Sequence, residues 1–349
     1  MKMANVRLKA KETTVELLSV GATIQKLYTP DREGNISDIV LGCDDVDMYR
    51  MGNTPYFGGI VGRVANRIQN GSFTLDGVTH QLARNNGANC LHGGVVGFNQ
   101  VEWEITSEEE RSVTFEYVSE DGEEGFPGRV HVIVRYELEN DGSSLTINME
   151  GRVLGDKATP LNLAGHSYFN LGGHSSGDCL QHELELVHVE YFTPVDSNQI
   201  PTGEIVHVDE EPAMDFRTPK AVGLDIDKAP GNIGYDHNFV LHGMGKDVAV
   251  RVHNGMVSDT AELAAVLYDP KSGRGMRVLT TAPGLQLYSG NFLDGTLQGK
   301  SGFKYNKHGG ICLETQGFPD AVNQSNFPCT VFAPGDVYRH IVRYEFFTR

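Results

Sequence analysis

Cysteine is scarce in this chain, and its placement argues against two kinds of stabilising site. The five cysteines are an odd number, are widely scattered and form no C-x-x-C pair; they are Cys43, Cys90, Cys179, Cys312 and Cys329. A disulfide framework and a thiolate zinc site both need paired or closely spaced cysteines, so the sequence predicts neither. We therefore expect a reduced, intracellular protein.

Long apolar runs are also missing. Residues 1–20 alternate charged residues with short apolar runs, and no stretch there reaches the length of a signal peptide or a membrane span. We therefore expect a cytoplasmic protein that has no membrane partner.

Positive charge is in the minority. The 349 residues include 46 acidic and 29 basic side chains, which gives a net charge of -17. Such a field repels nucleic acid, anionic membrane surfaces and phosphorylated substrates, whereas a neutral substrate such as a sugar is not repelled. A negative net charge also aids solubility in proteins of many functions. The charge is therefore explained equally well by a neutral substrate or by solubility alone.

Sustained helical periodicity is scarce, whereas alternation of apolar and polar residues recurs and is typical of half-buried strands. The expected strands are 101–105, 113–117, 130–136, 145–149 and 184–189. Asp-Gly pairs at 76–77, 121–122, 141–142 and 294–295 supply the positive φ angles that tight hairpins need. With no visible linker or fixed-period repeat, the pattern predicts a mainly β, antiparallel sandwich in one domain, residues 1–349.

Several catalytic motifs are absent as well. The chain has no G-x-S-x-G nucleophile elbow, no P-loop and no dinucleotide fingerprint after a strand, which argues against acyl transfer, nucleotide hydrolysis and hydride transfer. No H-x-H pair points two imidazoles from one strand face at one ion, so we expect no metal.

Polar residues cluster in a few short segments that break the alternation: 62–67, 91–94, 166–171, 235–239, 283–288 and 312–316. His92 precedes two glycines, which let the backbone approach a ligand closely, although turn geometry alone also explains them. Glu314 follows an apolar stretch, where a buried carboxylate is costly unless it is hydrogen-bonded or used, so it is a candidate base. The alternative is that Glu314 lies on the solvent face of an alternating strand.

Taken together, these segments resemble those of the aldose 1-epimerases, the galactose mutarotases, and occur in the same order over most of the chain. The most specific matches are Tyr56–Ile68 (YFGGIVGRVANRI), Ser289–Thr296 (SGNFLDGT), and Glu314–Gln316 leading to Phe318–Ala321. The resemblance implies a large antiparallel β-supersandwich of the galactose mutarotase type. It also implies an open cleft that binds one free aldohexose without metal or cofactor.

The resemblance also implies a role for individual residues. Glu314 falls on the general base, His166 on the general acid, and His92 on a second histidine that binds and orients the sugar. The hydroxyl-binding positions fall on Asn66, Arg67, Asp236 and Gln286, and Tyr168 is expected near the sugar. The stretch 162–165 before the acid departs from the family, because Ala164 and Gly165 stand where polar residues are common.

One base and one acid suit an anomer exchange, in which the C1 hydroxyl loses a proton while the ring oxygen gains one. An unperturbed imidazole, with a pKa of about 6.5, is mostly neutral at pH 7. We therefore expect Asp236 and Glu314 to stabilise the His166 cation. The alternatives are a non-catalytic carbohydrate-binding protein, a phosphohexose epimerase, or a glycosidase or lyase, although glycoside hydrolysis usually needs two carboxylates. We expect a monomer, with a dimer as the alternative; the preferred sugar is left open.

Overall fold

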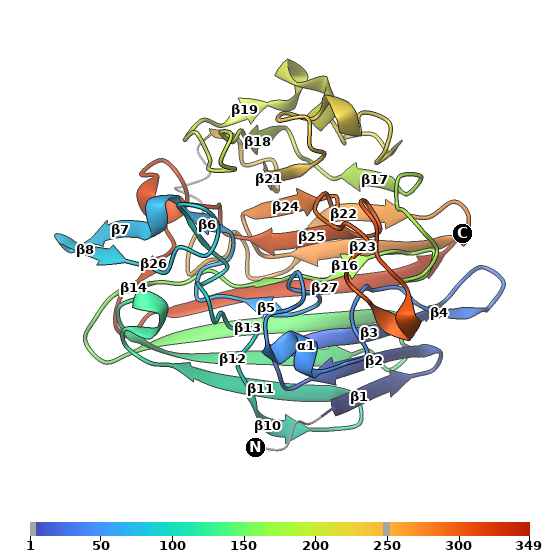
Figure 1. The fold of residues 1–349 in the computed structure, drawn as a ribbon, viewed down its shortest axis with the longest axis horizontal. Helices are drawn as coiled ribbons and strands as arrows, with labels where there is room; N and C mark the ends of the chain where they lie inside the picture. The colour runs from blue at the N-terminus through green and yellow to red at the C-terminus, as the bar shows by residue number, and fades with distance from the viewer. Residues whose placement is uncertain (1–4, 247–251) are drawn as a thin grey trace.

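The computed structural model describes residues 5–246 and 252–349. Strands dominate it, as Figure 1 shows, and the sheets are antiparallel, which confirms the expected mainly β class. Within the described ranges the helices are short: α1 (Asp47–Arg50) and the 3₁₀ turns η1 (Gln69–Gly71), η2 (Glu123–Gly125), η3 (Val208–Glu210), η4 (Pro212–Met214), η5 (Ile226–Lys228), η7 (Lys300–Gly302) and η8 (Ala321–Asn323). None of these helices has the length and apolarity needed to cross a membrane.

A nine-stranded sheet is the largest element of the fold. In spatial order its strands are β10 (Glu104–Glu108), β11 (Ser112–Ser119), β12 (Arg129–Leu138), β13 (Ser144–Leu154), β27 (Val337–Thr348), β23 (Arg274–Thr280), β22 (Glu262–Tyr268), β17 (Glu183–Leu186) and β20 (Lys220–Ala221). The C-terminal strand β27, red in Figure 1, lies between β13 and β23 and joins the two halves of the sheet.

A six-stranded sheet carries the polar segments of the second half of the chain. Its order is β16 (Tyr168–Phe169), β25 (Ile311–Gln316), β24 (Gly284–Tyr288), β21 (Asp236–Val240), β18 (Tyr191–Thr193) and β19 (Val206–His207). All residues of β21, β24 and β25 are buried.

Smaller sheets complete the fold. The four-stranded sheet contains β1 (Asn5–Ala10), β2 (Thr13–Leu18), β3 (Thr23–Pro30) and β4 (Ile36–Asp38) in sequence order. Short pairs join β14 (Thr159–Pro160) to β26 (Val331–Phe332), β15 (Ala164–Gly165) to β5 (Ile60–Val61), β6 (Arg67–Ile68) to β9 (Cys90–Leu91), and β7 (Ser72–Leu75) to β8 (Val78–Gln81).

The main hydrophobic core lies where these sheets meet. Its largest cluster combines Val15 of β2, Val134 of β12 and Leu313 of β25, each with at most 1% of its surface exposed. β12 alternates buried and more exposed residues along its length, which explains why period-two patterning revealed it.

The strand predictions hold for the long hairpins and fail at two boundaries. β11, β12 and β13 contain the expected strands 113–117, 130–136 and 145–149. Only the last two residues of 101–105 belong to β10, and β17 ends at Leu186, three residues before the expected end of 184–189.

Of the expected Asp-Gly hairpin turns, one is a tight hairpin and another lies in a long loop. The pair at 76–77 is a two-residue hairpin with both φ angles positive, 49° and 76°. The pair at 294–295 lies instead in the long loop between β24 and β25, although Gly295 does have a positive φ.

Candidate active site

The six-stranded sheet has one apolar face and one polar face. Successive side chains of a strand point to opposite faces, so Ile311 and Leu313 of β25 pack in the main core while Glu314 faces the other way. Residue pairing across the sheet extends this polar face over Tyr168, Asp236, Asn238, Gln286, Tyr288, Cys312, Glu314 and Gln316. Strand register thus brings together Glu314, Gln286, Asp236 and Tyr168, which lie far apart in the sequence.

The other expected site residues come from short segments beside this face. Asn66 immediately precedes β6, Arg67 is the first residue of β6, and His92 follows β9, the pairing partner of β6. Asn66 and His92 both have left-handed backbone angles, φ 63° and φ 51°. Gly93 also has a positive φ, and a side chain there would have its Cβ only 1.9 Å from the carbonyl oxygen of Gly62. The glycine after His92 is therefore required by close backbone packing.

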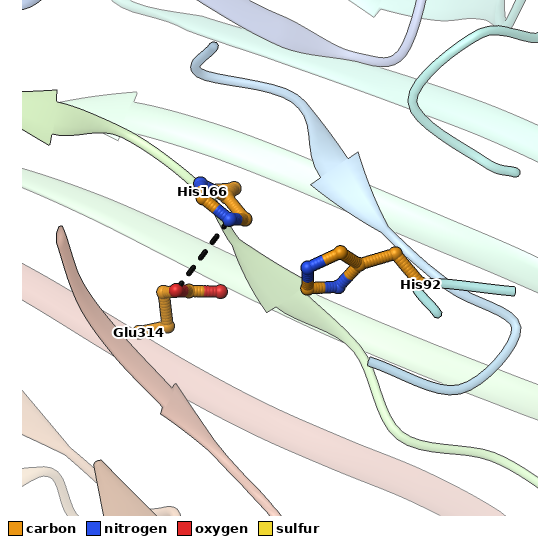
Figure 2. A group of neighbouring side chains, drawn as sticks. All are labelled: His92, His166 and Glu314. Atoms are coloured by element: carbon orange, nitrogen blue, oxygen red, sulfur yellow. Dashed lines mark ion pairs between the residues drawn. The ribbon is translucent and has the colours of Figure 1, made fainter. Parts of the chain in front are cut away.

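Three ionisable side chains meet at the centre of the site. His166, which follows β15, places Nε2 3.5 Å from Oε1 of Glu314. His92 joins them. One imidazole nitrogen from each histidine and one carboxylate oxygen of Glu314 all lie within 4.8 Å of one another. Figure 2 shows the three side chains entering from separate segments and facing one another. The expected base, acid and second histidine are therefore neighbours in space.

The expected hydroxyl-binding residues form a second connected group. Gln286 Nε2 donates to Asp236 Oδ1 at 2.7 Å, and Arg67 Nη1 lies 3.8 Å from Asp236 Oδ2. The backbone N–H of Arg67 donates to the side-chain oxygen of Asn66 at 2.8 Å. The group combines amide, guanidinium and carboxylate functions, which suits sugar hydroxyls that both donate and accept.

Glu314 is buried, with 2% of its surface exposed, which rules out a place on the solvent face. Burial raises the pKa of its carboxyl well above the ordinary value; the negative charge of Asp236 raises it further, and Arg67 opposes the shift. Oε2 of Glu314 has no hydrogen-bond partner within the described part of the chain. A buried oxygen of this kind is rare in folded proteins and calls for an explanation, which binding of a ligand hydroxyl would supply.

His166 is also buried, and burial lowers the pKa of its imidazole to about 4. This differs from the expectation that Asp236 and Glu314 hold His166 as a cation. Removal from water penalises the charged form of the imidazole and is the main cause of this shift. Burial thus pushes both members of the pair towards their neutral forms.

His92 has a hydrogen bond that fixes its tautomer. The backbone N–H of Asn66 donates to Nδ1 of His92 at 3.1 Å, so the neutral ring carries its hydrogen on Nε2. Burial, assisted by the positive charge of the nearby Arg67, holds the pKa of His92 well below its usual range. The neutral ring therefore presents an N–H donor at Nε2. A metal ion would need the Nε2 lone pair instead, so the three side chains fit a metal poorly despite their spacing.

Aromatic rings enclose the two histidines. Tyr168 stacks on His166 with ring centroids 5.1 Å apart and is itself buried, so one face of the imidazole packs against an aromatic ring. Tyr56 lies 4.5 Å from the His92 ring and 5.5 Å from the His166 ring. Tyr56 was not among the expected site residues, although it opens the specific run Tyr56–Ile68.

The unusual residues before His166 are accommodated by backbone pairing. Ala164 and Gly165 form β15 and pair with Val61 and Ile60 of β5. A Cβ added at Gly165 would meet only the Ile60 side chain, at 3.9 Å. Polar side chains are therefore not needed to hold this segment in place.

Comparison with known proteins agrees with this geometry. A model of the family described as aldose 1-epimerase matches residues 5–345. The chain belongs to the aldose 1-epimerase family. It is an isomerase with the expected galactose mutarotase-like fold.

Individual relatives of this aldose 1-epimerase family member cover nearly its whole length. Galactose mutarotase from Bos taurus is 46% identical over 97% of this chain and 93% of its own. Aldose 1-epimerase from Escherichia coli K12 is 34% identical over 95% of this chain and 91% of its own. The crystal structure of an aldose epimerase homologue from C. elegans superimposes with a TM-score of 0.87 at 29% identity, covering 99% of both chains.

Proposed function

We propose that the protein interconverts the α and β anomers of a free aldohexose such as galactose or glucose, with Glu314 and His166 moving the protons. The contact between His166 Nε2 and Glu314 Oε1, at 3.5 Å on the polar face of a buried sheet, carries this proposal. An acid and a base this close can serve two oxygens attached to the same carbon.

The reaction balances with these two groups alone. Glu314 takes the proton of the C1 hydroxyl while His166 gives a proton to the ring oxygen, and the bond between C1 and the ring oxygen breaks. The products are the open-chain aldehyde, a protonated Glu314 and a neutral His166. Rotation about the C1–C2 bond exposes the other carbonyl face, and the reverse transfers close the ring as the other anomer.

The pKa directions fit a pair that holds one proton. The proton lies on His166 when Glu314 is ionised, or on Glu314 when His166 is neutral. Burial favours the second arrangement in the free protein, since it raises the pKa of Glu314 and lowers that of His166. Sugar hydroxyls bound to both groups would stabilise the charged arrangement, because hydrogen bonds to a charged group favour that form.

Polarimetry of freshly dissolved α-D-galactose and α-D-glucose tests this proposal. We expect the optical rotation to relax faster in proportion to enzyme concentration. No acceleration over the spontaneous rate, from folded protein, would contradict it and favour a sugar-binding protein. Hexose 6-phosphates and oligosaccharides provide two further comparisons. A higher kcat/KM with the phosphate would indicate a phosphohexose epimerase, and release of new reducing ends would indicate a glycosidase.

We further expect one domain over residues 1–349, a monomer with a dimer as the alternative, a cytoplasmic location, and activity without metal or cofactor. Light scattering after size-exclusion chromatography measures the oligomeric state. If no metal is needed, the protein should keep full activity after dialysis against a chelator.

A further inference from the structure

A buried histidine outside the candidate active site joins the two large sheets. His340 of β27 has 1% of its surface exposed and contacts four polar groups. Its Nε2 lies 2.9 Å from the Thr315 hydroxyl and 3.2 Å from the Thr280 hydroxyl. Its Nδ1 lies 3.2 Å from both the Leu163 carbonyl oxygen and the Tyr338 hydroxyl. The proposed reaction does not use this ring.

The partners define the hydrogen positions on the ring. The Leu163 carbonyl oxygen can only accept, so Nδ1 carries the hydrogen and Nε2 accepts from a threonine hydroxyl. Burial lowers the pKa of His340 to about 4, which keeps the ring neutral. Both ring nitrogens are thus satisfied, as a polar group in an apolar core requires.

Both ends of this network reach the catalytic pair. Thr315 directly follows Glu314 on β25 and points to the core face, where Ile311 and Leu313 are its apolar neighbours. It is therefore the hydrogen-bonding side chain of β25 on that face.

The other end reaches the segment that carries the acid. Leu163 lies three residues before His166, and its backbone N–H donates to the Tyr338 hydroxyl at 3.1 Å. Side chains of β27 therefore hold the N–H as well as the carbonyl of Leu163.

We propose that His340 is a positioning residue that sets the spacing between Glu314 and His166, acting through Thr315 on one side and Leu163 on the other. This inference rests on the proposed function. Proton transfer depends steeply on geometry, and a misplacement of about 1 Å can cost on the order of 100-fold in rate. Through this network, the segments that carry Glu314 and His166 are both hydrogen-bonded to the His340 ring of β27.

The variant His340→Phe tests the proposal, because it keeps an aromatic ring and removes both nitrogens. We expect kcat for mutarotation to fall about 10- to 100-fold while KM changes little, since the hydroxyl-binding residues are untouched. His340→Gln keeps a donor and an acceptor and should recover much of kcat. Thr315→Val removes one hydroxyl at nearly constant volume and should lower kcat in the same direction if His340→Phe folds poorly.

A matched control separates positioning from ordinary core stability. His182 is another buried histidine with its pKa lowered to about 4, and its Nε2 accepts from the backbone N–H of Leu171 at 3.0 Å. We expect His182→Phe to lower the melting temperature and leave kcat unchanged. Unchanged kcat in folded His340→Phe and Thr315→Val would overturn the positioning role. A wild-type protein with no mutarotase activity would instead overturn the proposed function.

Discussion

Two strands of the molecule differ in how they are buried. They are β12 of the nine-stranded sheet and β25 of the six-stranded sheet. β12 alternates buried and more exposed residues, and its buried valines pack in the main core. All six residues of β25 are buried, with Leu313 in that core and Glu314 on the polar face. A strand covered on both faces can hold a carboxylate away from water, where its pKa shifts, whereas a half-exposed strand mainly contributes apolar burial. Substitutions in the two strands should therefore affect different quantities.

The largest effect is expected for Glu314→Gln on β25. The amide cannot take the C1 proton, so kcat should fall about 1000-fold, within the range typical of general acid–base groups. Polarimetry at saturating sugar measures the loss. Glu345→Gln, on the half-exposed part of β27, is the matched control and should keep wild-type kcat.

Leu145→Ala on β13 should affect stability instead of chemistry. Leu145 is fully buried in the main core, and removing a buried leucine side chain typically costs about 2–5 kcal/mol of unfolding free energy. Urea unfolding measures this loss, and kcat below the melting transition should stay the same. A large drop in kcat in fully folded protein would contradict the idea that this core residue contributes to stability alone.

The pH dependence of the wild type should report the catalytic pair. Below about pH 4 a second proton binds His166 and leaves no base, and above the raised pKa of Glu314 the pair loses its only proton. We therefore expect a bell-shaped profile of kcat/KM against pH, with activity lost on both sides. A flat profile from pH 4 upwards through the alkaline range would contradict a single shared proton.

Asp236→Asn sharpens that test. The negative charge of Asp236 helps raise the pKa of Glu314, so its removal should move the alkaline limb to lower pH. Loss of a charged hydrogen-bond acceptor should also lower kcat/KM about tenfold. The control is Asp141→Asn, in the exposed turn between β12 and β13. It should not shift the alkaline limb of the pH profile.

The smallest effect is expected for Arg339→Gln, one residue from His340 but on the more exposed side of β27. Its Nε lies 3.9 Å from Glu150 Oε2 in a pair that is partly open to solvent. Exposed pairs contribute little, so we expect a change of about 0.5 kcal/mol or less in unfolding free energy and an unchanged kcat.

The same contrast explains what could be predicted from the sequence. Alternation revealed β11 to β13, because one face of each strand is more exposed than the other. Strand β25 does not alternate in burial, so the orientation of Glu314 could not be derived from its neighbours. The resemblance to aldose 1-epimerases supplied the site residues, but the pKa of His166 depends on three-dimensional burial and differed from expectation. His340 looks like an ordinary inward-facing strand residue until its partners from other strands are seen.

The pairing of Gln286 on β24 with Glu314 on β25 also has a consequence for folding. A slip of one residue in this pairing turns every side chain of a strand to the opposite face. Glu314 would then enter the apolar core, and Leu313 would lie on the polar face of the sheet. The misaligned chain would carry an unpaired carboxyl among leucines, which is strongly unfavourable. The proposed catalytic carboxyl thereby helps the chain to select its correct strand alignment as it folds.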